Sequence, residues 1–165
     1  MAVGRFTFTI LGQPASKGNS RNIVLNPRTG RPMSIKSEAA RSFERIARLQ
    51  LPAAARRMLT GPVRVRVRIW YASMLSDLDE SIVLDVLQAV YTKRDKAGNR
   101  KLVRRGVYLN DRQVWEKHVY RAGIDPANPR VEVTVWPLDG QVELFAEEEQ
   151  SERVCAEVDS GEVVW

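Results

Sequence analysis

The run Pro62-Val-Arg-Val-Arg-Val-Arg-Ile-Trp-Tyr-Ala-Ser73 alternates apolar and charged residues, which is the pattern of a half-buried β-strand. Asp77 and Asp79 follow it closely. If the chain stays extended through Leu78, both carboxylates point the same way, because successive side chains alternate between faces. Two neighbouring carboxylates repel each other unless a cation lies between them or one is protonated. The pair therefore indicates a divalent metal; the alternative is a turn residue followed by a helix N-cap.

The surrounding pattern predicts one α+β domain over residues 1–139, followed by an acidic tail over residues 140–165. We expect an antiparallel or mixed sheet of about four strands with helices packed on it. Besides the opening run, alternation of apolar and polar residues predicts strands over residues 5–11, 113–122 and 130–136.

Two segments have the apolar spacing of helices. Ser37 is the expected N-cap of a helix over residues 38–49, and a second helix covers residues 80–91. Residues 12–36 are expected to form a long basic loop, and residues 92–106 an exposed basic hairpin or flexible loop. The expected buried stripes are Ala39, Phe43, Ile46 and Leu49 in the first helix, and Ile82, Val83, Val86, Leu87 and Val90 in the second.

Charge is distributed unevenly along the 165 residues, which carry a formal net charge of +6. Residues 1–139 hold 25 Lys and Arg against 12 Asp and Glu, whereas residues 140–165 hold one Arg against 8 acids. A strongly basic body favours nucleic acid as partner, since contacts of Lys and Arg to phosphates release counterions. The acidic tail is expected to be mobile. It either competes with DNA for the basic surface, anchored by Trp165, or acts as a solubilising or partner-binding tail.

The composition excludes several classes of protein. The single cysteine, Cys155, allows no disulfide framework and no cysteine-based zinc site. No apolar run approaches membrane-spanning length, and the first residues lack the apolar core of a signal peptide. We therefore expect a cytoplasmic protein with no membrane partner and no organic cofactor.

Several motifs occur in a characteristic order. Gly12-Gln-Pro-Ala-Ser-Lys17 ends the first strand, Asp77-Leu-Asp79 precedes a helix with Val83-Leu-Asp-Val-Leu87, and Tyr108-Leu-Asn-Asp-Arg-Gln-Val114 leads into a strand. Over about residues 5–137 this order resembles the RusA family of Holliday-junction resolvases. The resemblance implies a RusA-like fold and a homodimeric endodeoxyribonuclease of bacterial or prophage origin, which resolves four-way junctions or related branched DNA in recombination and repair.

The resemblance also implies roles for individual residues. Asp77, Asp79 and Asp111 would be the catalytic carboxylates that bind Mg²⁺, with Mn²⁺ as a substitute, and Asp85 or Glu80 would be a further acidic ligand. Hard Mg²⁺ prefers oxygen ligands of this kind. The residues expected to contact DNA phosphates are Lys17, Arg21, Lys93, Arg94, Arg100, Lys101, Arg104 and Arg105.

The chain departs from the family pattern next to the carboxylate pair. Glu80 stands where the family commonly has Asn, and no Lys lies one helical turn further on, near Val83. Lys17 or a basic residue of the 93–105 stretch is the expected replacement. Two alternative functions follow: a basic DNA-binding protein without catalysis, or a nuclease for other DNA structures such as flaps and forks.

Overall fold

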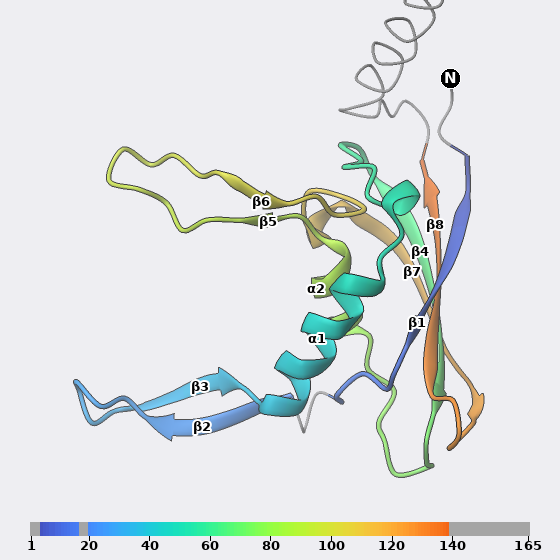
Figure 1. The fold of residues 1–165 in the computed structure, drawn as a ribbon, viewed down its shortest axis with the longest axis horizontal. Helices are drawn as coiled ribbons and strands as arrows, with labels where there is room; N and C mark the ends of the chain where they lie inside the picture. The colour runs from blue at the N-terminus through green and yellow to red at the C-terminus, as the bar shows by residue number, and fades with distance from the viewer. Residues whose placement is uncertain (1–3, 17–19, 139–165) are drawn as a thin grey trace, which may run out of the picture.

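A four-stranded mixed sheet forms the centre of the molecule (Figure 1). The computed structural model describes residues 4–16 and 20–138. The strand order is β1-β8-β4-β7, in which β4 and β7 are parallel and the other neighbours are antiparallel. The α+β class and the mixed four-stranded sheet are therefore confirmed. The strands are β1 (Phe6–Leu11), β4 (Val63–Tyr71), β7 (Val114–Ile124) and β8 (Arg130–Pro137).

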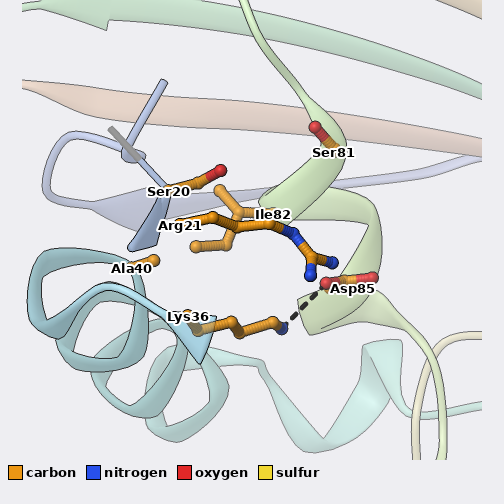
Figure 2. A pocket seen from close by; sticks show the side chains of 7 residues that line it. All are labelled: Ser20, Arg21, Lys36, Ala40, Ser81, Ile82 and Asp85. Atoms are coloured by element: carbon orange, nitrogen blue, oxygen red, sulfur yellow. Dashed lines mark hydrogen bonds and ion pairs between the residues drawn. The ribbon is translucent and has the colours of Figure 1, made fainter. Parts of the chain in front are cut away.

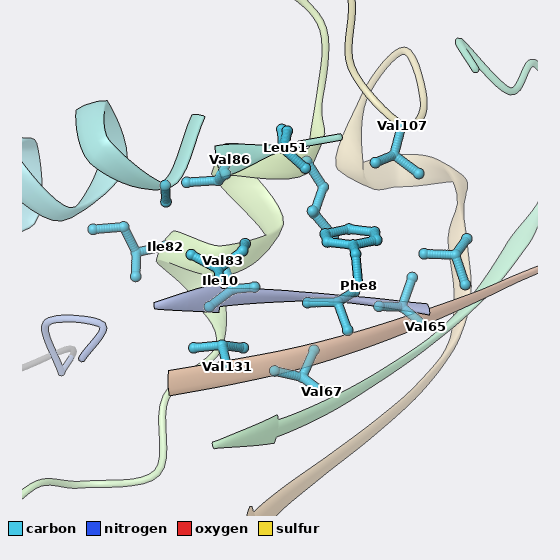
Figure 3. Close-up of a cluster of buried hydrophobic side chains, with 14 of the residues drawn as sticks. Phe8, Ile10, Leu51, Val65, Val67, Ile82, Val83, Val86, Val107 and Val131 are labelled. Carbon is cyan, nitrogen blue, oxygen red and sulfur yellow. The ribbon is translucent and has the colours of Figure 1, made fainter. Parts of the chain in front are cut away.

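The alternation in β4 separates the two faces of the sheet. Its valines, Ile69 and Tyr71 are buried, whereas its arginines and Trp70 are half-buried on the opposite side. The buried residues face the helices, which cover one side of the sheet, and they pack with Phe8, Ile10 and Val131 (Figure 3). On the other face, Arg64 pairs with Glu116 and Arg68 with Glu132.

Helix α1 (Glu38–Gln50) begins as predicted, with the Ser37 hydroxyl accepting the amide N–H of Ala40 at 3.2 Å. Its predicted buried stripe is wrong except at Phe43. Ile46 and Leu49 are 46% and 71% exposed, and Ala39 is exposed as well. The buried positions form a different i, i+3, i+4, i+7 stripe. This stripe includes Glu44, whose charge is neutralised by Lys36, which precedes the helix, and by Arg48 within it. The buried positions are Ala40, Phe43, Glu44 and Ala47.

Helix α2 (Ser81–Leu87) is shorter than the predicted helix over residues 80–91. Its buried residues are Ile82, Val83, Val86 and Leu87, as predicted. The helix ends because Gln88 takes an extended conformation, and Val90 then belongs to strand β5 (Val90–Tyr91) rather than to the helical stripe. Strand β5 pairs with β6 (Leu102–Arg104), which confirms the exposed hairpin expected over residues 92–106.

A second hairpin replaces most of the loop expected over residues 12–36. Strands β2 (Arg21–Leu25) and β3 (Pro32–Lys36) pair antiparallel around a turn in which Gly30 has a φ of +64°. Figure 1 shows both hairpins projecting from the same side of the molecule, the side on which the helices lie. Two 3-10 turns, η2 (Ala53–Ala55) and η3 (Asp111–Gln113), complete the described elements. Within these residues, no helix is long and apolar enough to cross a membrane.

Candidate functional site

The segment that carries Asp77 and Asp79 is fixed to the end of β4 by one tyrosine. The hydroxyl of Tyr71 donates to the carbonyl oxygen of Asp77 at 2.9 Å and accepts the amide N–H of Asp79 at 3.3 Å. Burial raises the pKa of this hydroxyl, the amide of Asp79 and the charge of Arg121 oppose the shift, and the charges of Asp79 and Glu80 add to it. Tyr71 therefore stays neutral and holds both carboxylate-bearing residues through their backbones.

The chain does not stay extended from β4 through Leu78, and the two carboxylates differ in exposure. Strand β4 ends at Tyr71, and residues 72–76 form bends and a turn. As a result Asp77 is exposed, whereas Asp79 is only 8% exposed. The strand ends early because Arg121 of β7 draws the next segment in, donating to the carbonyl oxygens of Met74 and Ser76.

The carboxylate of Asp79 bonds to Ser81, the first residue of α2, but Asp79 lies one position before the N-cap, Glu80, so the N-cap role considered for it is not confirmed. Its Oδ1 accepts the amide N–H of Ser81 at 3.0 Å and also accepts the Ser81 hydroxyl. Among the residues that the structure describes, no donor reaches its second oxygen, and none reaches either carboxylate oxygen of Asp77. Three carboxylate oxygens of this segment are thus available to a ligand.

The two further acidic candidates already have cationic partners. Glu80 forms an ion pair with Lys117 of β7, and Asp85 pairs with Lys36 of β3 at 2.9 Å. A metal ion at either position would have to compete with an ammonium group. Their use as ligands is therefore less favourable than that of Asp77.

Asp111 belongs to a different segment from Asp77 and Asp79. It opens η3 just before β7, whereas Glu80, the neighbour of Asp79, pairs with Lys117 further along that strand. Within the described residues, no three acidic, histidine or cysteine side chains gather as a metal-binding group. The metal role of Asp111 stays a prediction.

Asp111 interacts electrostatically with Tyr108. Burial raises the pKa of the Tyr108 hydroxyl strongly, and the charges of Asp111 and Asp85 add to the shift. The hydroxyl donates to the carbonyl oxygen of Leu84 in α2 at 3.1 Å. Tyr108 therefore links the segment before β7 to the helix that follows Asp79.

A cavity of about 460 Å³ lies next to Asp79, between the base of the β2–β3 hairpin and the two helices (Figure 2). Arg21 and Lys36 extend into it from the hairpin, and Asp85 faces them from α2. Sequence reasoning missed Lys36 and this cavity, because they depend on the hairpin that the loop prediction left out. The lining residues are Ser20, Arg21, Lys36, Ala40, Ser81, Ile82 and Asp85.

The residues predicted to contact DNA lie in different surroundings. Lys93, Arg94, Arg100, Lys101 and Arg105 are exposed, and the first four belong to the β5–β6 hairpin and its tip. Arg21 lines the cavity, and Lys17 and the tail residue Trp165 lie outside the described residues. Arg104 is different: it donates to the carbonyl oxygen of Arg48, and burial together with the charges of Arg56 and Arg48 lowers its pKa.

No protein-family model and no curated protein matches this chain. The function is therefore argued from the residues and their arrangement.

Proposed function

We propose that this protein is a Mg²⁺-dependent, structure-selective endodeoxyribonuclease that acts on Holliday junctions or related branched DNA in recombination and repair. The observation that carries the proposal is the Asp77-Leu-Asp79 segment, which presents free carboxylate oxygens beside a cation-lined cavity. In a basic protein, a carboxylate pair can bind a divalent ion, and the ion can in turn bind a phosphate of the nucleic acid.

The donor set suits the ion. Mg²⁺ is commonly bound by one or two carboxylates together with water and substrate phosphate, so Asp77 and Asp79 suffice as its protein ligands. When bound, the ion would polarise the scissile phosphate and lower the pKa of an attacking water. The residues of the chain have their own tasks: Tyr71 fixes the spacing of the two aspartates, and Ser81 orients the carboxylate of Asp79.

The two hairpins supply the basic surface for DNA. The loop between β5 and β6, residues 92–101, carries five cations against Asp95, and the turn of the β2–β3 hairpin carries Arg28 and Arg31. Both hairpins project from the side of the sheet that the helices cover, as Figure 1 shows. Contacts of this kind would neutralise backbone phosphates with little reading of bases, as binding selective for DNA structure requires. The five cations are Lys93, Arg94, Lys96, Arg100 and Lys101.

A homodimer with twofold symmetry fits the substrate, since paired cuts across a four-way junction need two equivalent sites. A RusA-like, cytoplasmic enzyme remains our proposal on the motif order given above. The second candidate is a DNA-binding protein without catalysis; it is favoured because no three acidic, histidine or cysteine side chains of the described residues gather as a metal-binding group.

One cleavage experiment tests the proposal. The purified protein is incubated with a labelled four-way junction in Mg²⁺, in Mn²⁺ and in EDTA, with linear duplex, flap and fork DNA as parallel substrates. We expect paired cuts in the junction that require the divalent ion. Binding of the junction without cleavage in either metal would support the non-catalytic candidate, and preferred cleavage of flaps or forks would reassign the substrate.

A further inference from the structure

The cavity at the base of the β2–β3 hairpin has a charge balance that favours an anion. Lys36 pairs with Asp85 and Glu44, each at 2.9 Å, and Arg48 pairs with Glu44 as well. Burial alone favours the neutral amine, but the hydrogen bonds to Asp85 and Glu44 outweigh it and raise the pKa of Lys36. The charges of these four groups therefore sum to zero; the groups are Lys36, Arg48, Glu44 and Asp85.

Arg21 is the remaining charged group of the cavity wall. It lies opposite Lys36 in the β2–β3 register, and Figure 2 shows its guanidinium extending across the cavity toward Asp85. Within the part of the chain that the structure describes, no ion pair or hydrogen bond involves this guanidinium. Because a guanidinium keeps its proton at every physiological pH, the cavity carries one uncompensated positive charge.

The remaining wall suits the apolar part of a nucleotide. Ile82 of α2 is 5% exposed and contributes an apolar edge, Ala40 of α1 lies behind the wall with 0% exposure, and Ser20 and Ser81 contribute polar groups. The volume of about 460 Å³ falls in the range of small-molecule sites. Ser81 also connects the cavity to the candidate metal site, since its amide and hydroxyl both donate to Asp79.

We propose that this cavity binds one nucleotide of a DNA strand, with the phosphodiester on the guanidinium of Arg21 and the deoxyribose against Ile82. A phosphodiester carries a single negative charge, which matches the single uncompensated cation. Guanidinium groups bind phosphate oxygens in a two-pronged geometry that also fixes orientation. The inference deepens the proposed function: a strand held here is positioned with its next phosphate toward Asp79.

Binding of the dinucleotide TpT, which contains one phosphodiester, tests this site without cleavage. The full chain is titrated with TpT in the absence of Mg²⁺, and binding is followed by amide NMR shifts and calorimetry. We expect the wild-type shifts to centre on Lys36, Ser81 and Ile82. Arg21→Gln should weaken TpT binding at least about tenfold, because it removes a charge-assisted contact. The matched control, Arg5→Gln, removes the same charge from an exposed position outside both hairpins and should leave TpT binding within about twofold.

Three results would overturn the inference: no TpT binding by the wild type at millimolar concentration, equal binding by Arg21→Gln and wild type, or shifts confined to the hairpin tips. Thermal unfolding of both variants verifies that they fold. Junction cleavage by the wild type is measured separately. Cleavage without TpT binding in the cavity would overturn this inference alone, and TpT binding without cleavage would overturn only the proposed nuclease activity.

Discussion

Replacement of Lys36 by methionine should destabilise the protein, because this residue joins the β2–β3 hairpin to both helices. Its ammonium donates to Glu44 of α1 and to Asp85 of α2, each at 2.9 Å. The side chain of Glu44 is only 11% exposed, so its charge depends on nearby cations. In Lys36→Met both carboxylates lose this partner, although Arg48 still pairs with Glu44 and Gln88 still donates to Asp85.

The magnitude follows from these contacts. Hydrogen bonds to charged groups contribute about 1.5–3 kcal/mol each when buried, and partial exposure together with the retained partners brings the total to about 2 kcal/mol. For a chain of this length, that loss lowers the Tm by about 6 °C. Thermal and guanidinium unfolding followed by circular dichroism measure it. The control is Arg64→Met, which breaks an ion pair whose two side chains are 40% and 44% exposed; it should lower the Tm much less than Lys36→Met, because solvent screens exposed ion pairs.

The pH dependence gives an independent check. A raised pKa means that the contribution of Lys36 is present below the ordinary value of 10.5 and is lost as the pH rises through the folded-state value above it. The difference between wild type and Lys36→Met should therefore be constant near neutral pH and shrink in strong alkali. Equal Tm values for Lys36→Met and Arg64→Met at pH 7 would refute the role assigned to the network.

Three further outcomes are expected. Tyr71→Phe loses the hydrogen bonds to Asp77 and Asp79, so the free energy of unfolding should fall by about 1 kcal/mol. Junction cleavage by this variant should slow while its affinity for the junction is unchanged. Tyr91→Phe, at an exposed position, is the control, and unchanged cleavage by Tyr71→Phe would remove Tyr71 from the site. Gly106→Ala places a Cβ against the backbone of residues 87–89, so the free energy of unfolding measured by chemical denaturation should fall by about 3 kcal/mol. In Gly4→Ala the added Cβ contacts nothing, so this control should be as stable as wild type. Equal stability of the two variants would contradict the packing described. The hydrogen bond from Arg130 lowers the pKa of Asp125 below its ordinary 3.8, so this contribution is fully present above 3.8 and is lost as the pH falls through the lower folded-state value; Arg130→Gln should therefore lower the Tm more at pH 7 than in strong acid, and an equal loss at both would exclude this ion pair as the cause.

The elements with a strong local pattern are those that the sequence predicts best. In β4, alternation identifies both the strand and its buried face, because an arginine follows each valine. The apolar residues at the start of α2 identify its buried stripe in the same way. The β2–β3 hairpin also has a local signal, since Asn26-Pro27 and Gly30 lie between two apolar runs. Its basic composition led to the loop prediction instead.

The remaining differences depend on contacts between distant segments. The burial of Glu44 in α1 requires Lys36 from β3, so helix periodicity alone selects the wrong face. The path of the chain before Asp77 depends on Arg121 of β7, which donates to the carbonyl oxygens of Met74 and Ser76. The position of Asp111 depends on the parallel pairing of β7 with β4, which no local pattern specifies. The cavity beside Asp79 appears only once the hairpin and both helices are in place.

Cleavage of a four-way junction by Asp79→Asn tests the proposed carboxylate site most directly. Asparagine keeps the Oδ1 that accepts the Ser81 amide, so the fold and junction binding should be unchanged. What it removes is the negative charge beside Asp77. We predict that Asp79→Asn binds the junction with wild-type affinity and cleaves it at least about a hundredfold more slowly in Mg²⁺. Cleavage at the wild-type rate by this variant would contradict the assignment of Asp77 and Asp79 as the catalytic metal site.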